Sequence, residues 1–245
     1  MSGKATLHPD NTGADLQAWW MPFTHNRLFK SKPRLIESAQ GAYYTLVDGR
    51  RVFDGLSGLW CSPLGHSPPR VVEAVQRQVA KLDFSPSFQM GHPAAFTLAS
   101  RIARFAGRPD DRVFFVNSGS EAVDTALKVA VAYHRARGEA SRTRIIGRER
   151  AYHGVGIGGI SVGGIPANRK AFAPLMMPAV DHLPHTWDPT QMRHSRGQPA
   201  WGAHLADELE RLVALHDASN IAAVIVEPMQ GSTGVIVPPR GYLEK

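Results

Sequence analysis

The sequence N-S-G-S-E-A-V-D-T-A-L-K, at residues 117–128, decides the fold because it joins a predicted strand to a predicted helix. The preceding run R-V-F-F-V, at residues 112–116, is rich in β-branched and aromatic residues, which is typical of a buried strand. Apolar residues then recur at helical spacing, at Ala122, Val123, Ala126, Leu127, Ala130 and Val131. We therefore expect a strand that turns through Asn-Ser-Gly-Ser into a helix.

Such a turn is a possible anion site. The first backbone N–H groups of a helix have no partner inside the helix, and the positive end of its dipole lies there. Gly119 would let the backbone approach a phosphate, and the hydroxyls of Ser118 and Ser120 would add hydrogen bonds. Ser118 and Glu121 equally fit a capping box, which satisfies a helix start without any ligand. The stretch alone leaves both interpretations open.

Length and composition indicate a soluble globular protein. The chain has 245 residues, of which 43% are hydrophobic and 20% charged, enough for one large or two modest domains. No run approaches the roughly 18 to 20 apolar residues of a membrane span, and residues 1–10 lack the apolar core of a signal peptide. Cys61 is the only cysteine, which excludes an internal disulfide. We expect a cytoplasmic protein with no membrane partner.

The formal net charge of +7 raises the question of nucleic-acid binding. The arginines are dispersed among acids, however, and there is no basic tail and no aromatic RNA-reading motif. We interpret the charge as a solvated basic face and expect no nucleic-acid partner. We also expect no metal, because His182 and His185 have a proline between them and no helical histidine pair carries an acid at the right spacing.

The predicted elements alternate along the chain. Residues 42–47 and 51–54 flank an Asp-Gly-Arg turn, which is typical of a hairpin. The remaining predictions are helices at residues 68–82, 93–107, 120–136 and about 200–215, and strands at 112–116, 143–147 and 221–226.

Apolar strands separated by amphipathic helices predict an α/β fold, with a largely parallel sheet and helices on both faces. We expect residues 1–67 to form an N-terminal arm and part of a smaller α+β domain, and residues 68–245 to form part of a large ligand-binding domain. Ligands in such sheets bind beyond the carboxyl ends of the strands, where residues 117–120 lie. Residues 238–245 resemble a helix start that stops after one turn, so we expect the chain to be incomplete.

Three further segments carry candidate site residues. Tyr152 and His153 follow the predicted strand at residues 143–147, and Tyr152 either stacks on a planar ligand or packs under a loop. Glu227 ends a strand that we expect to be buried, which favours a functional role. Leu59 and Trp60 lie in a loop rich in glycine and serine, where they form either a pocket wall or a plug of the core.

Gly154, Gly156 and Gly159 match the dinucleotide-binding pattern G-x-G-x-x-G. They do not directly follow a strand, and Pro166 interrupts the segment after them. We interpret these glycines as close helix packing or a mobile loop, and a nicotinamide enzyme stays as an alternative. Cys61 is interpreted as a small buried hydrophobe rather than a nucleophile.

Taken together, these motifs resemble the class III aminotransferases, which are pyridoxal-phosphate enzymes of fold type I. Trp60 with Cys61, and the arm W-W-M-P-F at residues 19–23, resemble the branch of ω-amino acid–pyruvate (β-alanine–pyruvate) transaminases. The resemblance extends along nearly the whole chain and rests on D-G at 48–49, L-W-C-S at 59–62, G-H at 65–66, F-F-V-N-S-G-S-E-A at 114–122, A-Y-H-G at 151–154, V-E-P-M-Q-G at 226–231 and P-R-G-Y at 239–242.

The resemblance implies a site for pyridoxal 5′-phosphate and a role for each candidate residue. Ser118, Gly119 and Ser120 would hold the phosphate. The pyridine ring would lie against Tyr152, with His153 beside it and Glu227 close to both the ring and Tyr152. The substrate pocket would be lined by Phe23, Leu59 and Trp60, and Phe88 would reach into the partner subunit's pocket in a homodimer.

The implied reaction moves an amino group from an ω-amino acid such as β-alanine, or from an amine, to pyruvate. In the family, the Schiff-base lysine and the aspartate at the pyridine nitrogen lie downstream of the Val-Glu-Pro segment, and no lysine of this chain occupies that motif. We therefore assign no catalytic residue and expect residues 1–245 alone to be inactive. The alternatives are another class III aminotransferase, of the ornithine or γ-aminobutyrate type, and a catalytically dead remnant that binds a phosphorylated ligand or a partner protein.

Overall fold

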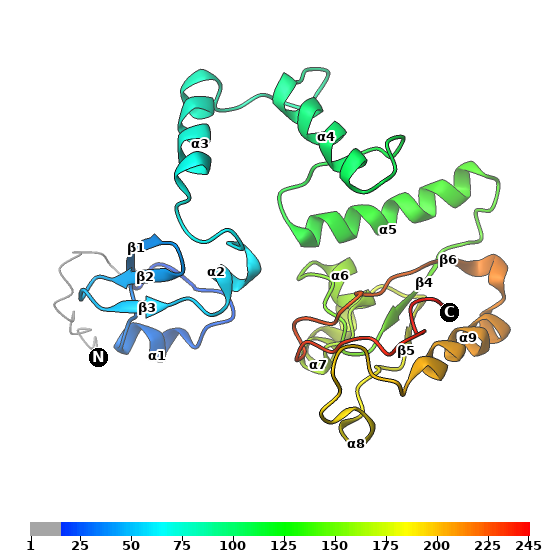
Figure 1. The fold of residues 1–245 in the computed structure, drawn as a ribbon. Helices are drawn as coiled ribbons and strands as arrows, with labels where there is room; N and C mark the ends of the chain where they lie inside the picture. The colour runs from blue at the N-terminus through cyan, green and yellow to red at the C-terminus, as the bar shows by residue number, and fades with distance from the viewer. Residues whose placement is uncertain (1–15) are drawn as a thin grey trace, which may run out of the picture. The chain divides into compact units, whose positions relative to one another are not determined.

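The computed structural model describes residues 16–245 and forms two compact units, Met1–Gly107 and Arg108–Lys245 (Figure 1). Within the described residues, no helix has both the length and the apolar character needed to cross a membrane. The domain boundary that the sequence predicts, between residues 67 and 68, stays a prediction.

The first unit is built on a small antiparallel sheet of order β1-β2-β3. The predicted hairpin is confirmed: Tyr43 pairs with Phe53 and Thr45 with Arg51, and Gly49 supplies a positive φ of 81° in the turn. In chain order the elements are α1 (Asn26–Ser31), β1 (Ile36–Gln40), β2 (Tyr43–Leu46), β3 (Arg51–Phe53), α2 (Ser57–Trp60), α3 (Pro69–Lys81) and α4 (Pro93–Phe105).

The second unit contains a parallel sheet of order β5-β4-β6, in which β4 is the central strand. Its elements are α5 (Gly119–Ala136), β4 (Arg144–Arg148), α6 (Ile157–Val162), α7 (Pro166–Phe172), β5 (Val180–Leu183), α8 (Pro189–Met192), α9 (Glu208–His216) and β6 (Ile221–Val224), with short 3-10 turns between some of them. The parallel α/β architecture expected from the sequence is confirmed.

The two faces of β4 are covered by different helices, because neighbouring side chains of a strand point to opposite faces. Ile145 packs with Leu127 of α5 and Val162 of α6. Ile146 packs on the other face, with Leu183 of β5 and Leu212 of α9. The prediction of helices on both faces of the sheet is therefore confirmed.

Two strand predictions need correction. Residues 112–116 form no strand, and Phe114 is 75% exposed. Strand propensity is realised only where a neighbouring strand supplies hydrogen bonds, and within the described chain no backbone–backbone bond is recorded for these residues. The strand predicted at residues 221–226 is shorter, Ile221–Val224, and is only half-buried.

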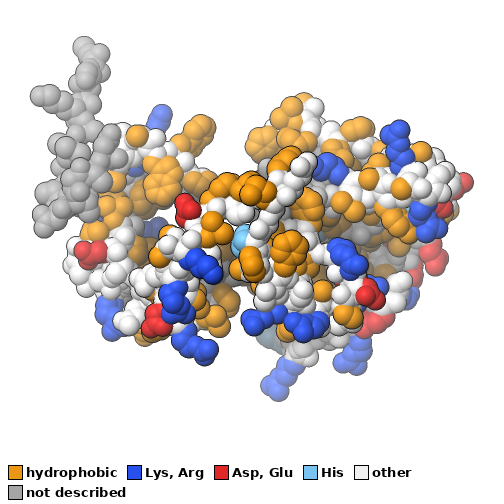
Figure 2. All heavy atoms as spheres, turned by 90° about the horizontal axis from the view of Figure 1, so that it is seen from above, with side chains coloured by type: hydrophobic (Ala, Val, Ile, Leu, Met, Phe, Trp, Pro, Cys, Tyr) orange, Lys and Arg blue, Asp and Glu red, His pale blue; other side chains and the backbone are white. Residues whose placement is uncertain are grey.

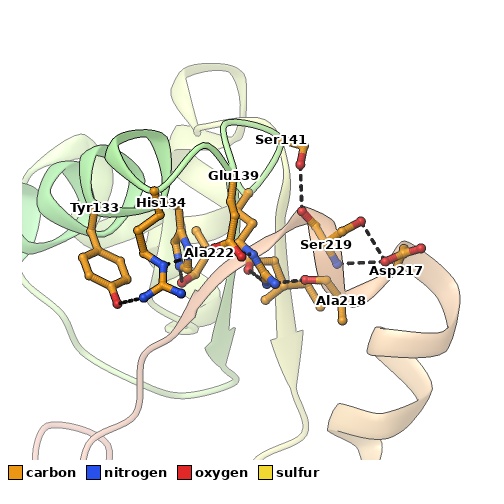
Figure 3. Close-up of polar contacts among 11 residues, drawn as sticks. Tyr133, His134, Glu139, Ser141, Asp217, Ala218, Ser219 and Ala222 are labelled. Carbon is orange, nitrogen blue, oxygen red and sulfur yellow. Dashed lines mark hydrogen bonds and ion pairs between the residues drawn. The ribbon is translucent and has the colours of Figure 1, made fainter.

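Polar contacts fix α5 along the sheet. The ring of His134, near the end of α5, makes hydrogen bonds to Glu139 Oε2 (3.1 Å) and to the carbonyl oxygen of Ala222 (2.9 Å), at the start of β6 (Figure 3). Asp217 Oδ1 accepts from the backbone N–H of Ser219 (2.8 Å) just before that strand. Since the last turn of α5 lies beside the beginning of β6, its first turn lies toward the carboxyl ends of the strands.

Candidate functional site

The first turn of α5 keeps donors free for an anion even though it is capped. Ser118 Oγ accepts from the N–H of Glu121 (3.1 Å), so the predicted serine cap forms, but Glu121 Oε2 accepts from the N–H of Asn117 (2.9 Å) and not from that of Ser118 as a full capping box requires. Among the described residues, no partner is recorded for the N–H groups of Gly119 and Ser120. A Cβ built on Gly119 would meet nothing within 4 Å. The turn therefore has two N–H donors and open space, which fits a phosphate group.

The loop after β4 is held against this turn. Ser120 Oγ accepts from the N–H of Val155 (2.9 Å), which leaves its own hydroxyl hydrogen to donate elsewhere. Gly154 has a φ of 108°, and a Cβ there would lie only 2.7 Å from Ser120 Oγ and 2.8 Å from Ser120 Cα. Only glycine fits this position, which keeps Tyr152 near the first turn of α5.

Glu227 connects the segment after β6 to the same loop. Its Oε1 accepts from the N–H of Tyr152 (2.7 Å), and its Oε2 accepts from the N–H of Gly231 (3.2 Å). Arg148 Nη2, at the end of β4, donates to the carbonyl oxygen of Glu227 (2.7 Å). The structure thus brings Ser120, Tyr152 and Glu227 together from three separate segments. The Tyr152 side chain stays 39% exposed.

His153 lies under this loop and is only 8% exposed. Burial, together with the positive charges of Arg148 and His182, lowers its pKa to about 4. The imidazole is therefore neutral at pH 7. Within the described chain, its Nε2 has no hydrogen-bond partner.

The glycines of the G-x-G-x-x-G pattern pack α6 against α5. A Cβ on Gly156 would lie 2.7 Å from Asp124 Oδ2, and the N–H of Gly159 donates to Asp124 Oδ1 (3.1 Å). The close-packing interpretation is therefore confirmed. Asp124 and Arg148 are two residues of the site that the sequence motifs do not mark. A charged residue beside an apolar segment is the only sequence signal for them: Asp124 adjoins Val123, and Arg148 follows the apolar run of residues 145–147.

The four residues expected at the substrate pocket all lie in the first unit, and their roles stay predictions. The exposed fractions of their side chains are high: Phe23 88%, Leu59 75%, Trp60 61% and Phe88 90%. Trp60 is thus not a plug of the core of its unit. The interpretation of Cys61 as a buried hydrophobe is wrong, because Cys61 is exposed.

One further expectation concerns metals. No group of three or more metal-ligating side chains is present in the part of the chain that the structure describes.

Comparisons with known proteins identify the family of this chain. The family model for class III aminotransferases matches residues 26–245. The chain is 60% identical over 237 residues to an ω-aminotransferase from Caulobacter vibrioides, covering 97% of this chain and 54% of that protein. It is 52% identical over 238 residues to a β-alanine–pyruvate aminotransferase from Pseudomonas aeruginosa, covering 97% and 52%.

A solved structure gives the same result for the fold. The ω-transaminase from Pseudomonas jessenii in complex with PMP matches with a TM-score of 0.85 and 33% identity, over 94% of this chain and 51% of that one. The chain spans about half the length of the curated relatives it matches. With three segments meeting at the carboxyl edge of the sheet and a family match over most of its length, the chain belongs to the class III aminotransferases.

Proposed function

We propose that this chain contributes the phosphate-binding part of a pyridoxal-phosphate-dependent transaminase, which moves an amino group from a β-alanine-like ω-amino acid, or from an amine, to pyruvate. The observation that carries the proposal is the meeting of the first turn of α5 with Tyr152 and Glu227. The names of the relatives support the choice of donor and acceptor.

Each residue of the site would have a distinct part. The N–H groups of Gly119 and Ser120 would bind the phosphate, aided by the hydroxyls of Ser118 and Ser120. Tyr152 would stack on the ring, since an aromatic side chain prefers a planar partner. Glu227 positions Tyr152 through the backbone N–H at 2.7 Å. When bound, the cofactor supplies an electron sink for the substrate amine.

His153 and the first unit complete the proposal. A neutral His153 would place no further positive charge beside the ring. Phe23, Leu59 and Trp60 would line the substrate pocket, and Phe88 would act across a homodimer. The homodimer and the cytoplasmic location stay predictions of the same proposal.

Removal of one phosphate-binding N–H without disturbing the helix is a direct test. Proline is favoured at the first position of a helix, and Ser118 already has the extended backbone (φ −153°, ψ 159°) that must precede it. We expect Gly119→Pro to weaken binding of pyridoxamine 5′-phosphate to the chain about tenfold, the effect of one lost charge-assisted hydrogen bond. Ligand fluorescence during titration measures this affinity.

Two controls make the result specific. Gly119→Ala keeps the N–H and adds only a Cβ, so it separates the loss of the donor from the effect of an added side chain, and we expect it to bind more tightly than Gly119→Pro. Pyridoxamine, which lacks the phosphate, should not distinguish Gly119→Pro from the parent. Equal binding of the phosphorylated ligand by all three proteins would contradict the proposed site.

The reaction itself is tested by following alanine formation from pyruvate. We expect β-alanine to be a better donor than ornithine or γ-aminobutyrate when the whole protein is assayed, and we expect no turnover from residues 1–245 alone. A preference for ornithine or γ-aminobutyrate would favour the other class III activities. An inactive whole protein that still binds the phosphorylated ligand would favour the dead remnant.

A further inference from the structure

The turn that carries Leu59 and Trp60 has an unusual backbone. Ser57, Gly58, Leu59 and Trp60 are four consecutive residues with positive φ, at 50°, 61°, 57° and 71°. Three of them carry a Cβ, which crowds the following carbonyl oxygen in this left-handed region. Such a conformation persists only where the surrounding structure fixes it, and it is concentrated at ligand-binding sites.

One carboxylate supplies the fixing contacts. Asp54 Oδ2 accepts from the N–H of Gly58 (2.6 Å), and Asp54 Oδ1 accepts from the N–H of Leu56 (3.2 Å). Further on, the N–H of Trp60 donates to the carbonyl oxygen of Leu56 (2.8 Å). The left-handed turn is therefore tied at its beginning to the side chain of Asp54.

Asp54 is in turn anchored to the sheet of its unit. His66 Nε2 lies 2.7 Å from Asp54 Oδ2, and the two side chains are only 14% and 7% exposed. The ring of Tyr44, on β2, lies against the His66 ring with centroids 4.5 Å apart. The backbone of His66 exchanges two hydrogen bonds with Gly41, of 2.7 and 3.0 Å, next to β2. The contacts thus run from the sheet through His66 to Asp54 and the turn.

The charge state of Asp54 suits this role. Burial alone raises its pKa, but hydrogen bonds from His66, Gly58, Leu56 and Tyr44 outweigh that effect and leave the pKa below its usual value. Asp54 is therefore ionised at neutral pH and accepts from both backbone donors.

We propose that Asp54, supported by His66 and Tyr44, is a positioning residue that holds the strained turn at Ser57–Trp60 and thereby fixes where Leu59 and Trp60 are presented to a substrate. This inference rests on the proposed function in one respect only, which is the assignment of Leu59 and Trp60 to the substrate pocket. The hydrogen bonds by which Asp54 holds this turn, here called the Asp54 clamp, lie within the first unit and need no cofactor.

Cys61 allows a direct test, because it is the only cysteine, is exposed and directly follows the turn. A nitroxide spin label attached to Cys61 in the 245-residue chain reports the mobility of the turn by electron paramagnetic resonance. We expect an immobilised spectrum in the parent and a mobile one in Asp54→Asn, whose neutral amide is a weaker acceptor and replaces one acceptor oxygen with a donor. His66→Gln should give intermediate mobility, because the carboxylate remains.

The matched control is Asp48→Asn. Asp48 also accepts from a backbone N–H, that of Arg50 (3.1 Å), but in the exposed hairpin turn of the same sheet. We expect it to leave the label spectrum unchanged. Circular dichroism shows whether each variant keeps the helix content of the parent. An immobilised label in both Asp54→Asn and His66→Gln would overturn the proposal, and so would equal mobility in Asp48→Asn and Asp54→Asn.

The pH dependence of the label mobility shows whether the ionised carboxylate of Asp54 holds the turn or whether the substitution disturbs the unit in general. Because the pKa of Asp54 is lowered in the folded chain, its contacts are fully present above the usual aspartate range and are lost as pH falls through the lowered value. His66 and Tyr44 are the titratable groups facing it, so the mobility change on acidification should persist in His66→Gln and Tyr44→Phe and be absent in Asp54→Asn. A label spectrum of the parent chain that does not change with pH would contradict the proposed role of Asp54. Failure to bind pyridoxamine 5′-phosphate would contradict the proposed function alone.

Discussion

His153 shows how one buried residue makes the stability of the second unit depend on pH. Its pKa is lowered to about 4 in the folded chain, whereas an unperturbed histidine titrates near about 6.5. Between these values the unfolded chain binds a proton that the folded chain does not. We therefore expect the contribution of His153 to the free energy of unfolding to be constant above about pH 6.5 and to fall as pH is lowered toward about 4.

Urea unfolding at several pH values measures this slope, and imidazole ¹⁵N resonances measure the pKa of His153 directly. His153→Gln should remove part of the slope, because it removes the titrating group. An imidazole that titrates near pH 6.5 in the folded chain would show that His153 is not desolvated as its burial indicates.

A second prediction for a single residue concerns the effect of Gly154 on stability and ligand binding. An alanine there would combine a positive φ of 108° with a clash against Ser120, so we expect Gly154→Ala to lower the free energy of unfolding by roughly 2 to 4 kcal/mol. It should also weaken binding of pyridoxamine 5′-phosphate, since the loop carrying Tyr152 must move away from α5. Denaturant melts and ligand titration measure the two effects.

Gly138 is the matched control for this substitution. It also has a positive φ, of 83°, but a Cβ there would meet nothing within 4 Å. Gly138→Ala should therefore cost only the backbone strain, about 1 to 2 kcal/mol, and leave ligand affinity unchanged. Equal losses for the two variants would mean that the close approach to Ser120 contributes nothing.

At the scale of elements, the sequence predicted those whose signal is local. The helix expected at residues 120–136 begins one residue earlier, at Gly119, because apolar periodicity and a serine cap both mark it. The hairpin was predicted for the same reason, since its turn chemistry lies in three consecutive residues. The placement of Tyr152 and Glu227 beyond strand ends followed from the α/β pattern itself.

The elements that were missed depend on contacts distant in sequence. β1 and β5 have few apolar residues, so only their pairing with β2 and β4 defines them as strands. Residues 112–116 show the converse case, because strong strand propensity finds no partner there. The contacts of Asp124 with Gly159 and of Arg148 with Glu227 likewise join residues that are distant in the sequence.

At the scale of the whole molecule, the chain exposes much apolar surface. α3 has the predicted apolar side, but Val72, Val75 and Val79 are 38%, 56% and 58% exposed. Hydrophobic side chains are likewise visible over the surfaces of both units (Figure 2). Exposed apolar area favours association, because its burial stabilises by roughly 25 cal/mol per Å².

We therefore expect the 245-residue chain to self-associate at micromolar concentration, which size-exclusion chromatography with light scattering measures. Val75→Glu with Val79→Lys should reduce the association, since the pair places charge on the apolar side of α3 and adds a favourable i,i+4 ion pair within the helix. Arg77→Lys, a substitution at an exposed charged position of the same helix, should change nothing. A surface that favours contact between copies would yield larger species under those conditions. A parent chain that elutes as a monodisperse monomer and melts cooperatively would therefore show that these valines drive no association.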